Sequence, residues 1–153
     1  MKTATDHKSE GSEVVELQIA ARAENVALAR LALTGVAAAA GAPPAVVADL
    51  KLAVSEACTN AVQHAYADTR ANGDERVTLR FVVSGRKLRV DVEDEGSGFG
   101  FITRSSWEES LDDDAEADDR GLGMGLTIVR SVTDELEIES GARGSRVVFS
   151  KGF

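Results

Sequence analysis

The sequence is poor in cysteine and in long apolar runs. Its 153 residues contain one cysteine, Cys58, so no disulfide can form within the chain, which suits a reducing compartment. The alanine-rich stretch at residues 31–42 is interrupted by a threonine and two glycines and is too short to span a membrane. Residues 1–12 contain no apolar segment of the signal-peptide type, and we expect them to form a flexible polar tail. We therefore predict a cytoplasmic protein with no membrane association.

Basic residues are outnumbered by acidic ones, and the excess of acid is concentrated in one segment. The chain has 17 Lys and Arg against 26 Asp and Glu, a net charge of −9. This charge argues against direct binding to the phosphate backbone of nucleic acid. Residues 99–120 contain eight acids and two arginines, so this segment alone carries −6. Such a run is usually a solvated loop, but this one lies between two glycine-rich motifs.

The order of the predicted elements indicates an α+β fold in a single domain, residues 13–153, which is long enough to bury a core. We expect a strand, two helices, a β-hairpin, a long loop, a third helix and a second hairpin. These are predicted at residues 14–19, 23–40, 44–66, 76–83 with 87–93, 122–133, and 135–140 with 145–150. The first hairpin is too tight for a helical crossover. We therefore predict a two-layer α/β sandwich, with a mixed, mostly antiparallel sheet and helices on one face.

The first motif lies on the helix that begins at Pro44. Glu56, Asn60 and His64 follow one another at intervals of four residues and form a polar stripe along the helix. Such a stripe is more often a solvated face than a site, and His64 alone is more typical of a packed or capping histidine. As a site, the stripe has a specific chemistry. An asparagine carbonyl can bind Mg²⁺, and a glutamate one turn earlier can accept the proton of an attacking hydroxyl.

The second motif stands where the strand at residues 87–93 ends. Asp94 is followed by Gly96 and Gly98, which allow a tight backbone turn. This spacing is ordinary in a strand-ending turn. In a nucleotide site, the same carboxylate can accept a hydrogen bond from the exocyclic amine of adenine, while the glycines let the base approach the backbone.

The third motif is glycine-rich and runs directly into an apolar helical pattern. It lacks the Gly-Lys-Ser/Thr ending of a P-loop and the acidic partner of a dinucleotide fingerprint. On its own, a glycine run of this kind is a flexible hinge. At the start of a helix, its exposed N–H groups can bind phosphate, and Arg120 adds a positive charge beside them. The motif consists of Gly121, Leu122, Gly123, Met124, Gly125, Leu126 and Thr127.

In this order, the three motifs resemble the N, G1 and G2 boxes of the GHKL ATPases, which share the Bergerat fold. The runs at residues 52–66 and 123–140 resemble, more narrowly, the anti-sigma-factor serine kinases of bacterial partner-switching systems, and the resemblance covers residues 14–150. It implies a serine/threonine-protein kinase that uses ATP and Mg²⁺ and regulates transcription in stress responses. Its implied partners are an anti-anti-sigma protein, which it phosphorylates, and a sigma factor, which it sequesters. It also implies a homodimer.

The resemblance assigns roles to individual residues. Glu56 matches the catalytic base, Asn60 the magnesium ligand, and His64 a residue of the nucleotide site. Arg30 matches an arginine that contacts partner proteins. Asp94, Gly96 and Gly98 match the adenine pocket. Arg120 and residues 121–127 match the phosphate-binding end of the ATP lid, which spans residues 99–120. With Glu56, Arg120 is the second expected catalytic residue, and it would act on the phosphate group that is transferred.

Three departures from the family pattern stand out. Alanine follows His64 where the family commonly has glycine, and Arg146 follows Ser145 where the family often has paired hydroxyl residues near the adenine. The lid is also unusually acidic, and its carboxylates would repel a triphosphate at close range. We therefore expect these acids to point outward, toward a basic partner surface, with Arg120 alone turned inward.

Two other functions fit parts of the same pattern. A catalytically silent regulator would use the same motifs to bind nucleotide and to contact a partner without transferring phosphate, and Glu56 is the residue that separates it from a kinase. A catalytic fragment of a histidine-kinase system would need a helical segment bearing a phospho-accepting histidine. The chain has two histidines, one in the tail and one in the first motif, which makes this third function the weakest of the three.

Overall fold

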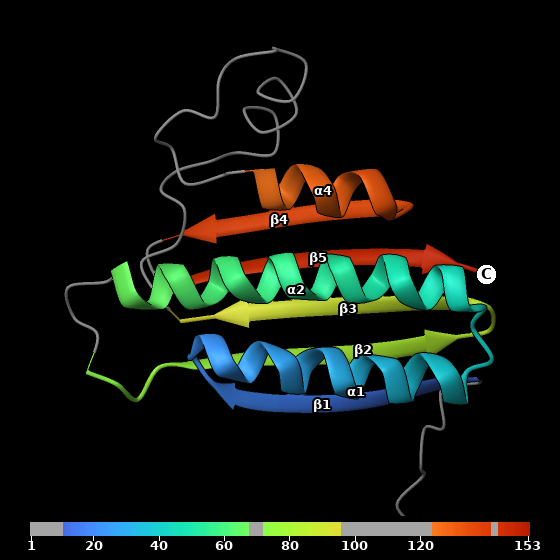
Figure 1. The fold of residues 1–153 in the computed structure, drawn as a ribbon, viewed down its shortest axis with the longest axis horizontal. Helices are drawn as coiled ribbons and strands as arrows, with labels where there is room; N and C mark the ends of the chain where they lie inside the picture. The colour runs from blue at the N-terminus through green and yellow to red at the C-terminus, as the bar shows by residue number, and fades with distance from the viewer. Residues whose placement is uncertain (1–10, 68–71, 96–123, 142–143) are drawn as a thin grey trace, which may run out of the picture.

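The computed structural model describes residues 11–67, 72–95, 124–141 and 144–153. A five-stranded sheet forms one layer and the helices form the other (Figure 1). The strands are β1 (Ser12–Ala20), β2 (Arg76–Ser84), β3 (Lys87–Asp94), β4 (Glu135–Gly141) and β5 (Gly144–Gly152). Their order across the sheet is β1-β2-β3-β5-β4, so β1 and β4 are the two edges. Every pairing among the described strands is antiparallel, which confirms the predicted α+β class and its mostly antiparallel sheet.

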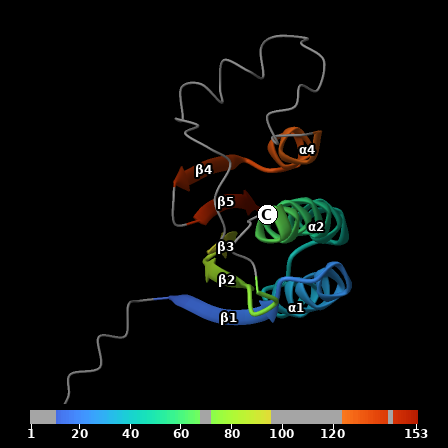
Figure 2. The same cartoon turned by 90° about the vertical axis from the view of Figure 1, so that its left-hand side faces the viewer.

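All the described helices cover the same face of the sheet (Figure 2). They are α1 (Val26–Ala39), α2 (Pro44–Ala67) and α4 (Met124–Val132). The predicted first helix is wrong in its opening turn, because η1 (Ala23–Asn25) is a 3-10 turn. There the Asn25 side chain donates a hydrogen bond to the Ala20 carbonyl at 2.9 Å and ties the turn to the end of β1. In the described part of the chain, no helix combines the length and apolarity needed to cross a membrane.

The core lies between the sheet and the helices. On the sheet side, Phe81 and Phe149 are almost fully buried, and burial of such a side chain contributes roughly 1.5–3 kcal/mol. On the helix side, small residues dominate α1 and α2, which lets the two helices approach closely. The apolar stripe predicted on α2 is confirmed where it is described, because its members Leu50, Val54, Ala57 and Ala61 are all buried. Asn60 is only 8% exposed, so this part of the polar stripe is not a solvated face.

Candidate functional site

The first turn of α4 packs directly against the polar stripe of α2. A Cβ atom placed on Gly125 would lie 2.7 Å from Glu56 Oε2 and 3.6 Å from Asn60 Nδ2. Carbon and oxygen atoms do not approach this closely, so a side chain at residue 125 would displace the Glu56 carboxylate. Leu126 and Val129 are fully buried and anchor α4 in the core. The structure thus brings the first and third sequence motifs into contact.

Asn60 carries unused hydrogen-bonding capacity in a buried position. Its Nδ2 atom is buried and has no hydrogen-bond partner among the described residues. A buried N–H donor without an acceptor costs free energy, so such a group usually marks a place where water or another hydrogen-bond acceptor binds. The amide oxygen is a hard donor of the kind that Mg²⁺ binds, and the half-buried Glu56 carboxylate lies one helical turn away. The donor set present therefore fits a magnesium ion that takes its other ligands from phosphate and water.

Asp94 lies at the end of β3, beside the start of β5. It is 6% exposed and faces Ser145, with which it is in register across the sheet. The Ser145 hydroxyl donates a hydrogen bond to Asp94 Oδ2. Because Val90, Val92 and Asp94 alternate with outward-pointing residues, the carboxylate is on the face of the sheet that the helices cover.

Gly144 allows the two strands to meet at this point. Its φ is +135°, and a Cβ atom there would lie 2.0 Å from the Asp94 carbonyl oxygen. No other residue type fits without moving β5 away from β3. The backbone at Gly144 therefore fixes the position of the Asp94–Ser145 pair.

A cavity of about 530 Å³ opens at this end of the sheet. It is bounded by the last residues of β3 and β4 and the first residues of β5. The lining residues are Glu93, Asp94, Glu139, Ser140, Gly141, Gly144, Ser145 and Arg146. The C-terminal half of α2, the start of α4 and the end of β3 lie toward this same side of the molecule (Figure 1). The arrangement can bind a base at the strand ends and phosphates near the start of α4.

Several predicted site residues lie outside the described part of the chain. These are Gly96, Gly98, the acidic segment at residues 99–120, which includes Arg120, and Gly121, Leu122 and Gly123. The backbones of His64 and Met124 belong to α2 and α4, but their side chains are also outside the description. Thr127 is exposed, one turn into α4, and Arg30 is exposed on α1. Among the predicted residues, the structure places Gly125 against Glu56 and Asn60.

Ser145 stands in the sequence where the family has hydroxyl residues near the adenine, but the sequence predicts neither its contact with Asp94 nor a role for Gly144. The hairpin pattern places both residues at the start of the last strand, but it does not reveal which strand lies beside them. The pairing of β3 with β5 joins residues about fifty positions apart and cannot be read from local spacing. A glycine immediately before an alternating strand is the one local signal of a backbone conformation that other residues avoid.

Comparisons with known proteins identify the family of the chain. A family model for the histidine kinase-like ATPase domain matches residues 19–151. The serine-protein kinase RsbW of Bacillus pumilus is 36% identical over 149 residues, which span 94% of this chain and 88% of that protein. The RsbW proteins of Bacillus subtilis and Staphylococcus aureus strain JH9 are also 36% identical, and they cover 84% and 91% of this chain and 79% and 88% of their own lengths.

Two solved structures share the fold. The RsbU and RsbW domains of Rv1364c from Mycobacterium tuberculosis superpose with a TM-score of 0.66 at 20% identity, over 92% of this chain. The chain spans only 32% of the length of that protein. The histidine kinase domain of the blue-light activated kinase EL346 from Erythrobacter litoralis superposes with a TM-score of 0.53 at 24% identity, over 94% of this chain and 68% of its own.

The family match covers most of the chain. The relatives that share 36% of its residues over nearly their full length are serine-protein kinases. The chain therefore belongs to the histidine kinase-like ATPase family, which binds ATP, and within that family to the serine-protein kinases of the RsbW type.

Proposed function

We propose that this kinase transfers the γ-phosphate of ATP to a serine or threonine hydroxyl of an anti-anti-sigma protein, and that it sequesters a sigma factor. The observation that carries the proposal is the packing of Gly125 against Glu56 and Asn60. This contact places a carboxylate and an amide, whose nitrogen has no hydrogen-bond partner among the described residues, beside the first turn of a helix. Phosphoryl transfer needs this set of groups: a base, a metal ligand and backbone donors for phosphate.

Glu56 acts as the general base in this proposal. Its carboxylate would accept the proton of the attacking serine hydroxyl while the phosphoryl group moves to the oxygen. Asn60 would hold Mg²⁺ through its amide oxygen, and the ion would neutralise charge on the phosphates. The N–H groups at the start of α4 would donate to phosphate oxygens, because a helix N-terminus carries unpaired donors and a positive dipole end.

Asp94 recognises the adenine base in this proposal. Its carboxylate would accept a hydrogen bond from the exocyclic amine of adenine, with Gly96 and Gly98 leaving room for the ring. We assign Arg120 and residues 121–127 to the phosphates, and residues 99–120 to a lid whose acids face a partner. His64 would lie in the nucleotide site. These assignments are supported by the order of the motifs and by the burial of Asp94 next to Ser145.

We propose that α1 contributes to partner binding. Arg30 is exposed there, and the neighbouring Leu31 and Leu28 are 70% and 50% exposed. Leucines this exposed on a helix, next to an arginine, form the kind of surface that docks a protein. Replacement of Arg30 by alanine should weaken partner capture and leave ATP affinity unchanged. Unchanged capture would remove Arg30 from the interface.

The proposal is tested by incubating the chain with γ-labelled ATP, Mg²⁺ and a purified anti-anti-sigma protein. The expected result is label on a serine or threonine of the partner, and loss of the label when that residue becomes alanine. A sigma factor should be retained on the immobilised chain when ATP and Mg²⁺ are present. Retention of sigma factor without any phosphate transfer would instead identify a catalytically silent regulator.

We also propose a homodimer that forms through β1. The two sheet edges differ in charge. On β4, Glu135, Glu137 and Glu139 alternate along one face, so pairing with a second copy would crowd six carboxylates together. On β1, Val14 and Val15 point to opposite faces and are 55% and 37% exposed. An antiparallel pairing of two β1 strands centred on Val14 would continue the sheet and cover both valines.

The dimer is tested by the molar mass of the chain in solution, measured by light scattering after gel filtration. Replacement of Val14 by lysine should convert a dimer into a monomer, because two cations would lie close to the two-fold axis. Replacement of Glu137 by lysine, on the other edge, is the matched control and should leave the dimer intact. A monomeric wild-type chain, or a dimeric Val14→Lys variant, would refute this interface.

We further propose that residues 13–153 form one domain preceded by a flexible tail, and that the protein works in the cytoplasm. The family match from residue 19 to residue 151 supports the first statement. The second is supported by the sequence, whose one cysteine is buried in the core. Limited proteolysis should remove the tail and leave a fragment that binds ATP.

A further inference from the structure

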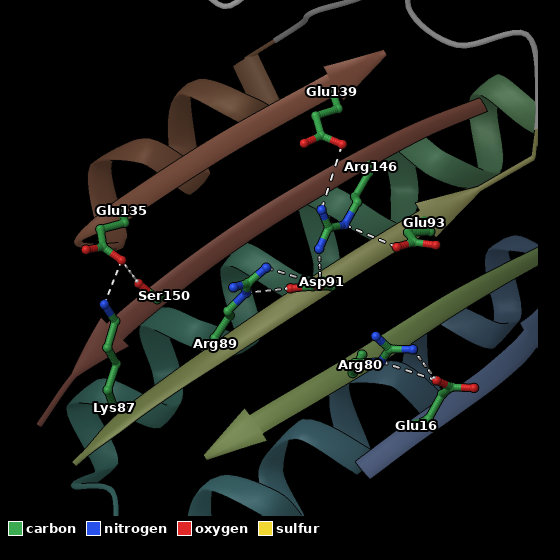
Figure 3. Close-up of polar contacts among 10 residues, drawn as sticks. All are labelled: Glu16, Arg80, Lys87, Arg89, Asp91, Glu93, Glu135, Glu139, Arg146 and Ser150. Atoms are coloured by element: carbon green, nitrogen blue, oxygen red, sulfur yellow. Dashed lines mark hydrogen bonds and ion pairs between the residues drawn. The ribbon is translucent and has the colours of Figure 1, made fainter. Parts of the chain in front are cut away.

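Arg146 joins three strands on the face of the sheet that the helices do not cover (Figure 3). Its Nη2 atom donates a hydrogen bond to Asp91 Oδ2 at 2.6 Å. Its Nε lies 3.1 Å from Glu93 Oε1, an ion pair without hydrogen-bond alignment, and its Nη1 lies 3.8 Å from Glu139 Oε2. Since Arg146 belongs to β5, Asp91 and Glu93 to β3, and Glu139 to β4, one side chain ties all three strands together.

Arg146, Asp91, Glu93 and Glu139 form a cluster that we call the clamp. It lies on the opposite face of the sheet from the candidate base-binding pair, Asp94 and Ser145. Across β3 and β5, Glu93 is in register with Arg146, and the next pair is Asp94 with Ser145. Successive side chains of a strand point to opposite faces, so the clamp is on the outer face while the Asp94–Ser145 pair is on the helix-covered face. Both pairs line the same cavity of about 530 Å³.

The position of the clamp matters because these are strand ends. β3 ends at Asp94 and β5 begins at Gly144, so the ladder of backbone hydrogen bonds stops here. Strand ends open more readily than strand centres. A side chain that bridges three strands at such an end limits how far the strands separate. It therefore also limits how far the Asp94 carboxylate and the Ser145 hydroxyl, on the other face, move apart.

The contact between Arg146 and Asp91 is a charge-assisted hydrogen bond to a buried carboxylate. The Asp91 side chain is only 6% exposed, and the hydrogen bond from Arg146 to this carboxylate raises the pKa of the guanidinium. Arg89 also contacts Asp91, at 2.9 Å, but both residues belong to β3. Arg89 thus forms an ion pair with the Asp91 carboxylate without joining two strands. Of these two arginines, Arg146 alone both contacts Asp91 and joins the strands.

We propose that Arg146 is a positioning residue that holds Asp94 and Ser145 in the geometry needed to select adenine. The inference rests on the proposed assignment of Asp94 to the base. Arg146 touches neither the base nor the phosphates in this account. It acts through the spacing of β3 and β5 and is therefore separable from the transfer chemistry.

The chain offers a matched control at the opposite end of the same strands. Lys87 of β3 lies 2.7 Å from Glu135 of β4, and Ser150 of β5 donates to the same carboxylate at 2.7 Å (Figure 3). Replacement of Lys87 by methionine removes a polar tie among the same three strands. Lys87 lies far from the Asp94–Ser145 pair. The Lys87→Met variant therefore measures how much the loss of one ion pair between these strands lowers stability, without disturbing that pair.

The test compares ATP with inosine triphosphate, which has a carbonyl where ATP has the exocyclic amine. Affinities of the wild type, Arg146→Met and Lys87→Met for both nucleotides are measured by titration calorimetry, together with thermal unfolding. We expect Arg146→Met to reduce the preference for ATP by roughly two- to thirty-fold, the range for a residue that acts through its neighbours. Lys87→Met should lower the unfolding temperature while the preference stays at the wild-type value.

Arg146→Lys provides a second variant that retains the charge and tests the geometry. A lysine cannot reach three carboxylates with a rigid fork, so we expect a preference between those of wild type and Arg146→Met. If Arg146→Met does not fold, a wild-type preference in Arg146→Lys overturns the inference. A wild-type preference in folded Arg146→Met overturns it as well. A wild-type chain that binds both nucleotides equally would instead refute the assignment of Asp94 to adenine.

Discussion

Gly125 of α4 faces Glu56 of α2 so closely that a Cβ atom would stand 2.7 Å from the glutamate Oε2. The contact joins the glycine-rich motif to the candidate base. Because α4 is anchored by buried Leu126 and Val129, it cannot easily retreat from α2. The position of the carboxylate therefore depends on the absence of a side chain at residue 125.

Replacement of Gly125 by alanine should displace the Glu56 carboxylate. We expect phosphate transfer to fall by about tenfold or more, because misplacement of a catalytic group by about 1 Å has effects of this size and larger. The measurement is the rate of label transfer from ATP at saturating nucleotide. Gly35→Ala is the control, since Gly35 lies within α1 with no heavy atom of the described residues within 4 Å of its Cβ position. It should stabilise the fold by about 0.5–1 kcal/mol and leave transfer unchanged.

Replacement of Gly144 by alanine should separate the first residues of β5 from the end of β3. The new Cβ would lie 2.0 Å from the Asp94 carbonyl oxygen, and the φ of +135° is strained for alanine. We expect a loss of at least about 1–3 kcal/mol in the free energy of unfolding, measured by urea denaturation. Gly141→Ala, where the described residues leave the Cβ position open, should change it by less than about 0.5 kcal/mol. Equal effects at the two positions would contradict the close approach.

Much of the fold follows from local patterns, as the predicted helix from Pro44 illustrates. Its apolar stripe, its start at proline and both hairpins are confirmed, because each depends on residues close in sequence. The opening of α1 was predicted wrongly, because the Asn25 side chain bonds to the end of β1 and a 3-10 turn results. That contact depends on where β1 ends in space, which periodicity does not report.

The sequence predicts which residues belong to the candidate site, but it does not predict which of them contact one another. The four-residue spacing of Glu56 and Asn60 identified one helix face, and the glycine run identified the start of α4. The burial of Asn60, the partnership of Asp94 with Ser145, and the Arg146 clamp all depend on the pairing of distant strands and helices. Nonlocal packing decides these features, and a single sequence carries little signal of it.

Cys58 should make the stability of the fold fall in alkaline solution. Burial raises the pKa of its thiol from an ordinary value of 9.0 to about 12. Between these values the unfolded chain loses the thiol proton and the folded chain keeps it, so stability present below pH 9 is lost as pH rises toward 12. The expected slope from this residue is at most about 1.4 kcal/mol per pH unit.

The measurement for Cys58 is urea denaturation from pH 8 to pH 10.5, beside a Cys58→Ala variant. The variant is expected to be less stable at neutral pH because of the cavity, but its stability should fall less steeply with pH. The native thiol should also resist aromatic disulfide reagents until the protein unfolds. Parallel pH profiles for the two proteins, or rapid labelling of the folded wild type, would contradict the burial of the thiol.

The central claim is that Glu56 is the base of a protein kinase, and one variant tests it most directly. Glu56→Gln keeps the size and polarity of the side chain and removes its ability to accept a proton at neutral pH. The paired measurement is ATP affinity by calorimetry and phosphate transfer to the anti-anti-sigma partner, with the exposed Glu137→Gln as control. We predict near-wild-type ATP affinity and a loss of transfer of roughly 10²–10⁴-fold in Glu56→Gln, with no change in the control. Transfer at the wild-type rate by Glu56→Gln would contradict the account.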